Sequence, residues 1–179
     1  MQQRPSYYFA YGSNLHPERL GRRTPSRRLV GVAELPGYDL RFHKRSGVDG
    51  SAKCDAYFTG DDDHRVLGVV YAMAEVDFPA LDRVESLGSG YALEVRPVTV
   101  DGRGLEVFLY VAQSGYIDPG SRPFGWYRDL VLQGARYHAF PEAYVRGIAE
   151  VQPVADPNPD RAAEHEEILR AMAGPGEGI

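Results

Sequence analysis

Alternating apolar and polar residues predict a series of β-strands in the first two thirds of the chain. Residues 7–11 are an aromatic and small-residue run that ends at Gly12-Ser13-Asn14, where the chain must turn. Turn residues also separate the later apolar runs. Further strands are therefore expected over residues 28–35, 38–43, 52–59, 66–73, 91–100 and 105–112, with the last two forming a hairpin through residues 101–104.

Helical periodicity interrupts the strands and dominates the last third of the chain. Pro17 suits a first helical position, because its missing N–H would have no intrahelical partner there. Glu18 suits the positive first turn of the same helix. Further helices are expected over residues 75–86, 126–137, 141–148 and 160–173.

This order of elements favours an α+β fold with a curved mixed sheet, because helices are interspersed rather than alternating regularly with strands. The length of 179 residues fits one domain. That domain is expected to span residues 1–151. Residues 152–179, rich in Pro, Asp, Ala and Glu, are expected to form a peripheral acidic tail with a short helix.

Composition describes an ordinary globular protein, with 43% hydrophobic and 25% charged residues. The formal net charge of -5 argues against a general nucleic-acid or anionic-membrane surface, which needs clustered Lys and Arg. One local basic cluster stands out, and its simplest interpretation is a solvated face. Its members are Arg19, Arg22, Arg23, Arg27 and Arg28.

Cys54 is the only cysteine, so no internal disulfide can form, and a reducing cytoplasmic setting is expected. The longest apolar run, residues 66–74, is too short to span a bilayer, and no signal peptide is recognisable. The histidines show no metal-ligand spacing, and the sequence has no nucleophile elbow and no phosphate-binding loop. We therefore expect neither a metal nor a cofactor.

The first candidate site is Tyr11-Gly12-Ser13-Asn14-Leu15, between a strand and a helix whose first free N–H groups point back toward the turn. Gly12 lets a ligand approach the backbone, while Ser13 and Asn14 add side-chain donors. A carboxylate or phosphate would fit such a position. The alternative interpretation is an ordinary strand-to-helix turn.

The second candidate is Glu85, which ends a helical run and precedes the flexible segment 86–90. A carboxylate at that position can face a cavity, although a Glu at a helix end is most often solvent-exposed. Asp82 lies three residues earlier and could share the same helix face, which raises the question of a carboxylate pair.

Together these two segments resemble the γ-glutamylcyclotransferase family. Residues 8–15, Tyr-Phe-Ala-Tyr-Gly-Ser-Asn-Leu, are similar to the family signature, and residues 81–85 resemble the segment that carries its catalytic glutamate. The resemblance keeps its order and spacing over residues 7–148 and leaves only the acidic tail outside. It continues through residues 67–71, 89–91 and 134–136 and through Pro141 and Tyr144.

The resemblance implies a small mixed β-barrel with peripheral helices, whose cavity lies at the barrel mouth beside the turn. It implies Glu85 as the catalytic acid/base and Tyr127 as a pocket hydroxyl. The implied substrate-binding residues are Tyr11, which would serve as a wall, and Gly12, Ser13, Asn14 and Leu15. Residues 114–125 depart from the family pattern, so Tyr116 is only a weak site candidate.

The implied reaction needs no metal, because a γ-glutamyl compound contains its own nucleophile. Its α-amine attacks the γ-carbonyl and closes the five-membered ring of 5-oxoproline, an intramolecular step that gains from orientation. A model α-amine titrates at about 8, so a base must accept its proton, and Glu85 is the candidate. The turn amides would hold either the substrate carboxylate or the developing oxyanion.

The leading hypothesis is thus a γ-glutamylcyclotransferase that acts on a small molecule and releases a free amino acid or amine. One alternative is an enzyme of the same chemistry that removes a γ-glutamyl cap from an intermediate bound to an acidic carrier protein, with the arginine cluster as docking patch. Another is a non-catalytic module that binds a small carboxylate. Nucleic-acid and membrane partners are not expected, and a homodimer is left open.

Overall fold

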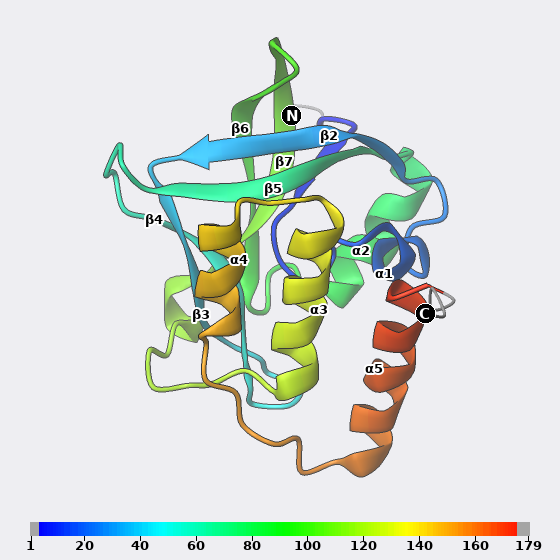
Figure 1. Cartoon of the computed structure of the whole chain (residues 1–179). Coiled ribbons are helices and arrows are strands. Elements are labelled where there is room, and N and C mark those ends of the chain that lie inside the picture. Colours follow the sequence, from blue (N-terminus) through cyan, green and yellow to red (C-terminus); the bar gives the residue numbers. More distant parts are fainter. Residues whose placement is uncertain (1–3, 175–179) are drawn as a thin grey trace.

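The computed structural model describes residues 4–174 and contains one mixed five-stranded sheet and one two-stranded sheet (Figure 1). The larger sheet has the strand order β2-β5-β1-β7-β6. Its strands are β1 (Tyr7–Ala10), β2 (Arg28–Pro36), β5 (Arg65–Ala72), β6 (Tyr91–Val100) and β7 (Arg103–Ala112). The smaller sheet is the antiparallel pair of β3 (Tyr38–Arg45) and β4 (Ala52–Phe58).

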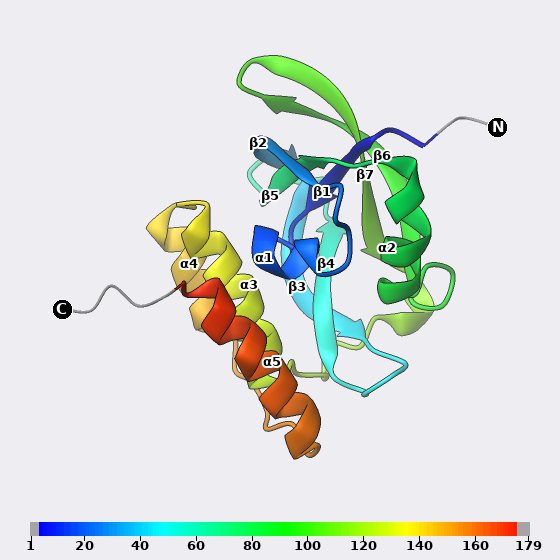
Figure 2. The ribbon, with the colours of Figure 1, turned by 90° about the vertical axis from the view of Figure 1, so that its right-hand side faces the viewer.

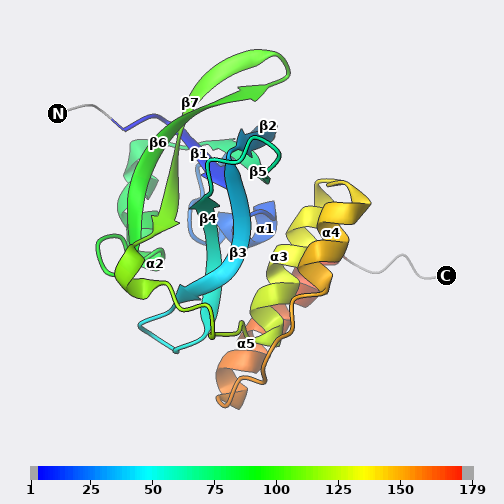
Figure 3. The same cartoon turned by 90° about the vertical axis from the view of Figure 1, so that its left-hand side faces the viewer.

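The short central strand β1 makes the larger sheet mixed, because it runs antiparallel to β5 and parallel to β7. The strands curl around one another into a half-barrel (Figure 3). The predicted α+β fold is therefore confirmed. Every predicted strand is present, with ends that differ from the prediction by at most two residues.

The helices lie on two sides of the curled sheet (Figure 2). On one side are α3 (Gly125–Tyr137), α4 (Glu142–Ala149) and α5 (Pro159–Met172), and on the opposite side is α2 (Phe78–Val84), which follows a 3-10 turn at Glu75–Asp77. The one-turn helix α1 (Pro17–Gly21) lies near α5. No helix within residues 4–174 is long and apolar enough to cross a membrane.

The hairpin between β6 and β7 is tighter than the sequence suggested. Val100 pairs directly with Arg103, so only Asp101 and Gly102 form the turn. Both have positive φ, 48° and 78°, as a type I′ turn requires. An Asp-Gly pair is among the preferred sequences for that turn, since glycine has no side-chain clash at positive φ.

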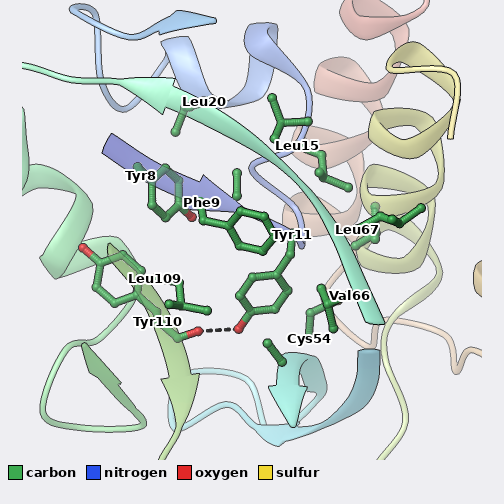
Figure 4. Close-up of a cluster of buried hydrophobic side chains, with 14 of the residues drawn as sticks. Tyr8, Phe9, Tyr11, Leu15, Leu20, Cys54, Val66, Leu67, Leu109 and Tyr110 are labelled. Carbon is green, nitrogen blue, oxygen red and sulfur yellow. Dashed lines mark hydrogen bonds between the residues drawn. The ribbon is translucent and has the colours of Figure 1, made fainter. Parts of the chain in front are cut away.

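The core fills the concave side of the sheet with residues of β1, β5 and β7 (Figure 4). Phe9 is fully buried, and it packs so closely on β5 that a Cβ added at Gly68 would lie 2.3 Å from its ring. Gly68 therefore makes room for the ring. Other fully buried side chains are Tyr71, Phe108, Leu15, Leu20, Leu81, Leu109 and Leu130.

The helix predicted in the acidic tail is present as α5, but it is not peripheral. The helix follows its N-cap residue Asn158, whose side chain accepts hydrogen bonds from the amides of Asp160 and Arg161. It buries Ile168 and Met172. The chain leading to it is held where Val154 bridges to Phe124. Helix α5 is therefore part of the packed structure. Whether residues 1–151 fold as a domain without it remains a prediction.

Candidate active site

The end of α2 directs Glu85 toward the interior of the half-barrel. Leu81 is fully buried and anchors the last turn of the helix, and its carbonyl accepts the Glu85 amide at 2.9 Å. Ser86 then takes a positive φ of 53°, which ends the helix. As a result the Glu85 side chain is only 16% exposed.

The Glu85 carboxylate is held by two side chains from the other end of the sequence. Asn14 Nδ2 donates to Glu85 Oε1 at 2.7 Å, and Arg23 NH1 lies 3.6 Å from the same oxygen. Arg23 also donates to Asn14 Oδ1 at 2.9 Å, so the amide and the guanidinium fix each other. Asn14 Nδ2 additionally lies 3.2 Å from the Tyr8 hydroxyl. The strand-to-helix turn and the end of α2 therefore form one site.

Asp82, the other carboxylate of α2, belongs to a different network. It accepts from Arg4 NH2 at 3.0 Å and from the Tyr110 hydroxyl. Neither contact involves Glu85, and so the geometry gives no support to a carboxylate pair. Asp82 instead fastens α2 to the N-terminal segment and to β7.

Glu85 borders a narrow recess of about 20 Å³ that is walled mainly by tyrosines. A larger cavity of about 240 Å³ adjoins it and shares four of its lining residues, Ser13, Glu85, Tyr91 and Tyr127. The two spaces meet at the carboxylate. The remaining walls of the recess are Tyr8, Tyr11, Gly12, Asn14, Cys54 and Tyr110.

Three of the five tyrosine hydroxyls of the recess are fixed by hydrogen bonds to the backbone. Tyr11 donates to the Tyr110 carbonyl, as Figure 4 shows, and Tyr91 donates to the Cys54 carbonyl. Tyr127 accepts from the Cys54 amide at 3.0 Å. Burial raises the pKa of each of these hydroxyls well above its usual value, so they stay protonated at neutral pH.

The turn after β1 closes through a hydrogen bond from the Leu15 amide to the Gly12 carbonyl at 3.1 Å. Gly12 lies so close to Cys54 that an added Cβ would be 3.1 Å from Cys54 Cβ. Within residues 4–174 the backbone amides of Ser13 and Asn14 donate to no protein acceptor, which leaves these two donors for a ligand.

The sequence predicted that Leu15 and the N–H groups of the following helix would take part in an anion site, and the structure arranges both differently. Leu15 is fully buried behind the turn, and its carbonyl accepts from the Tyr71 hydroxyl and from His138 Nε2. The helix is a single turn, and His16 Nδ1 already accepts the Glu18 amide. A short helix has a small dipole, Pro17 has no N–H, and the Glu18 amide is already engaged, so the helix start adds little to an anion site.

A buried lysine supplies positive charge to the cavity, and the sequence analysis missed it. Lys44 is only 3% exposed and lines the cavity, and no described carboxylate lies within ion-pair distance of it. Its ammonium lies 4.4 Å from the centre of the Tyr91 ring. Burial lowers the pKa of Lys44, and the Glu85 charge partly opposes that shift. Gly90 makes room for it, because an added Cβ would lie 2.7 Å from Lys44 Nζ.

The predicted arginine cluster does not form one solvated face. Arg19 and Arg23 line the cavity, whereas Arg22 is exposed and pairs with Glu18. Arg27 donates to the Pro17 carbonyl across the short helix. The charge pattern alone could not separate these roles, because α1 is too short to give a helical periodicity.

Cys54 lies in β4 with 2% exposure, between Gly12 and the tyrosines. Burial raises the pKa of its thiol, which opposes formation of the reactive thiolate. Tyr116 lines neither the recess nor the cavity, although its ring centre lies 5.9 Å from Lys44 Nζ.

Fold and site together describe a class of protein in which a largely buried carboxylate lines a small cavity of an α+β half-barrel. Comparison with known proteins gives the family: the profile described as Gamma-glutamyl cyclotransferase, AIG2-like matches residues 8–129, and the chain belongs to that family. The recognition made from residues 8–15 and 81–85 is thereby confirmed, and the protein is an enzyme of this family.

Curated relatives and solved structures agree with this assignment. The chain is similar to the gamma-glutamylcyclotransferases of Homo sapiens and Mus musculus, each 29% identical over 153 residues, which are 82% of this chain and 78% of the relative. A solved structure described as a gamma-glutamyl cyclotransferase superposes with a TM-score of 0.79 at 25% identity, covering 92% of this chain and 98% of that one.

Proposed function

We propose that this cyclotransferase releases 5-oxoproline from γ-glutamyl compounds and that Glu85 is its proton-transferring residue. The observation that carries the proposal is the position of the Glu85 carboxylate, hydrogen-bonded to Asn14 at 2.7 Å where the recess and the cavity meet. Glu85 is the one carboxylate among the residues that line the recess. The names of the relatives support the reaction class.

In the proposed reaction the substrate supplies both reacting groups. Glu85 accepts a proton from the substrate α-ammonium, and the freed nitrogen attacks the γ-carbonyl carbon to close the ring. The tetrahedral intermediate then collapses as the bond from that carbon to the leaving nitrogen breaks. The carboxyl of Glu85 returns its proton to that nitrogen, and the ring nitrogen gives up its second proton, which the released amine takes up as it becomes an ammonium. Both protons lost by the ring nitrogen thus end on the leaving nitrogen, and the enzyme ends the cycle unchanged.

The glutamyl α-carboxylate is proposed to bind between the free amides of Ser13 and Asn14 and the Lys44 ammonium. This deepens the expectation from the sequence, which left open whether the turn holds a carboxylate or an oxyanion. A buried ammonium without a carboxylate partner is costly to maintain, and a substrate carboxylate would offset that cost. Lys44 lines the same cavity as Glu85 and thus supports this placement.

Tyr127 and Tyr91 are proposed to shape the recess for the folded substrate. Both rings line recess and cavity, and both hydroxyls are bound to the Cys54 backbone, so they present fixed polar edges. Tyr11 is proposed as a wall of the recess, because its hydroxyl is committed to the Tyr110 carbonyl. Leu15 supports the turn from behind and is not proposed to touch the substrate.

The carrier-protein alternative keeps only part of its proposed docking patch on the surface, where Arg22 and Arg28 are exposed. Two members of the proposed docking patch, Arg19 and Arg23, face the cavity rather than the outer surface. A non-catalytic binding module would share the cavity and the cations. Turnover separates it from the enzyme, because only the enzyme consumes its ligand.

The experiment is incubation of the purified protein with γ-glutamyl dipeptides, a γ-glutamyl amine and a blocked analogue without a free α-amine. Mass spectrometry would follow 5-oxoproline. We expect turnover of at least one dipeptide and none of the blocked compound, which lacks the nucleophile. Hydrolysis of the blocked compound to glutamate would show attack by water and overturn the proposed ring closure.

A further inference from the structure

The cavity next to the recess is strongly cationic although the protein as a whole is acidic. Five positively charged side chains line it and only two carboxylates, Asp49 and Glu85, do so. The cations come from α1, β3, β4, α5 and the chain after α1, and Figure 2 shows α1 close to α5. They are Arg19, Arg23, Lys44, Lys53 and Arg161.

Three of these cations have a carboxylate partner within the protein. Lys53 Nζ lies 2.9 Å from Asp49, and Arg23 lies 3.6 Å from Glu85. Arg161 binds Asp156 with two nitrogens, with Nε at 2.7 Å. Among residues 4–174, Lys44 and Arg19 are the lining cations for which no carboxylate lies within ion-pair distance.

Arg19 is held in place but not neutralised. The residue is 6% exposed, its NH1 lies 3.4 Å from His165 Nδ1, and its Nε is buried without a hydrogen-bond partner. Burial and the nearby cations lower the pKa of His165 to about 4, so this imidazole is uncharged at neutral pH. A guanidinium keeps its proton even when buried and offers a planar fork of donors that matches a carboxylate or phosphate.

Proton transfer from the substrate ammonium to Glu85 leaves the total charge of the cavity unchanged, but it removes the negative charge that lies beside Arg23. The glutamyl carboxylate offsets one cation, which we assign to Lys44. A leaving group with one carboxylate would then offset only one of the two cations Arg23 and Arg19. A leaving group with two acidic groups would offset both.

We propose that the leaving amine carries two negative charges, as an acidic amino acid does, and that Arg19 binds the distal one. The proposal rests on the cyclotransferase function and specifies its substrate class. His165 and Trp126 are positioning residues in this arrangement. Their rings stack at 3.7 Å, and His165 in turn contacts Arg19, so α5 fixes the arginine against the cavity.

The test compares γ-glutamylglutamate with γ-glutamylglutamine, which have nearly the same shape and differ by one charge. We expect kcat/KM to be about ten-fold higher for the glutamate compound, the value of one charge-assisted hydrogen bond. The preference should shrink as salt rises, since the cavity is open to solvent and its charges are partly screened. Equal kcat/KM values in the wild-type protein would overturn the proposal.

Arg19→Met tests the assignment, because it keeps the unbranched apolar stem of the side chain and removes the charged guanidinium. The ratio of the two kcat/KM values should fall to about one, and Arg19→Lys should restore part of it. Arg22→Gln is the control at the C-terminal end of the same short helix, and it should leave the ratio unchanged because Arg22 is exposed and pairs with Glu18. An unchanged ratio in Arg19→Met would refute the role of Arg19.

Two outcomes separate this inference from the function on which it rests. Turnover of γ-glutamylalanine but not of γ-glutamylglutamate would refute the dianionic leaving group and leave the cyclotransferase intact. No 5-oxoproline from any γ-glutamyl compound would refute the function and the inference with it. If Arg19→Met does not fold, the wild-type comparison and its salt dependence still decide the question.

Discussion

Asn14 and Glu85 lie 71 positions apart in the sequence and are joined by a hydrogen bond of 2.7 Å. The bond ties the turn after β1 to the end of α2, and the same Asn14 side chain accepts from Arg23. The carboxylate is thus oriented by groups that the first 25 residues supply. A group held this way loses little conformational freedom when substrate binds, which favours proton transfer in a fixed geometry.

Glu85→Gln should abolish nearly all turnover while the protein stays folded. The amide keeps the shape of the side chain and its place beside Asn14, but it cannot accept a proton. General acid/base groups contribute about a hundred- to ten-thousand-fold, so kcat should fall by that amount. Steady-state release of 5-oxoproline measures the loss, and thermal unfolding checks the fold.

Asp82→Asn is the matched control for that substitution. Asp82 is three residues earlier on α2 and bonds to Arg4 and Tyr110 rather than to Glu85. We expect a lower melting temperature and a kcat within a few-fold of wild type. A loss of kcat equal to that of Glu85→Gln would mean that the two carboxyl groups titrate together.

Gly12→Ala should reduce kcat/KM by about ten-fold, because the turn must shift to relieve the new contact. An added Cβ would lie 3.1 Å from Cys54 Cβ and 3.5 Å from the Tyr127 hydroxyl, so the displacement reaches the recess directly. Gly115→Ala is the control, since an added Cβ there meets nothing within 4 Å. Wild-type kcat/KM in Gly12→Ala would show that the turn can shift without disturbing the recess.

Thiol reagents should leave activity unchanged under native conditions. Cys54 is 2% exposed and burial raises the pKa of its thiol, so little thiolate is available for alkylation. Incubation with iodoacetamide followed by mass measurement should show unmodified protein, and the same treatment in denaturant should add one group. Rapid native alkylation with loss of turnover would show that the recess opens more than its packing indicates.

Removing residues 154–179 should destabilise the protein rather than leave an intact core. The deletion exposes the surface that Ile168 and Met172 cover, at a cost of about 1.5 to 3 kcal/mol for each fully buried side chain. It also removes Asp156, which accepts from Trp126 Nε1 at 2.8 Å. Thermal unfolding of the truncated protein should show a lower midpoint, and an unchanged midpoint would support the domain limit at residue 151 predicted from the sequence.

The sequence predicted the strands and both segments of the candidate site because each is encoded locally. Aromatic alternation, turn residues and the motifs of residues 8–15 and 81–85 are visible without any knowledge of contacts. Lys44 was missed because of an irregularity in its own strand. The β3–β4 register shifts between Phe42 and Lys44, and a bulge of this kind turns a side chain to a face that simple alternation does not predict.

Arg19 was misread because its environment comes from the far end of the chain. Its partner His165 is 146 positions away, and the helix that carries His165 looked like a peripheral tail in the sequence. Nothing in the spacing of the arginines indicates which of them α5 will cover. Long-range burial of this kind is set by packing between elements, so only the folded chain distinguishes Arg19 from the exposed Arg22.

The stacked pair Trp126 and His165 provides an optical test of how α5 docks. The protein has a single tryptophan, and the centres of the two rings are 3.7 Å apart. Burial lowers the pKa of His165 to about 4, and the neighbouring charges of Arg19, Arg23 and Lys53 act in the same direction against the opposing charge of Asp156. The imidazole therefore stays neutral until the solution is clearly acidic.

Tryptophan fluorescence should consequently fall with a midpoint near pH 4 rather than near 6.5, since a protonated imidazole in contact with an indole quenches its emission. Between these pH values the unfolded chain binds a proton that the folded chain does not, so the free energy of unfolding must decrease as pH falls from about 6.5 to about 4. His165→Phe keeps the stacking but cannot take up a proton, and it should remove this part of the pH dependence in both fluorescence and thermal unfolding. A quenching midpoint near 6.5 in the wild-type protein would mean that His165 is open to solvent, and α5 would then not hold Arg19 against the cavity.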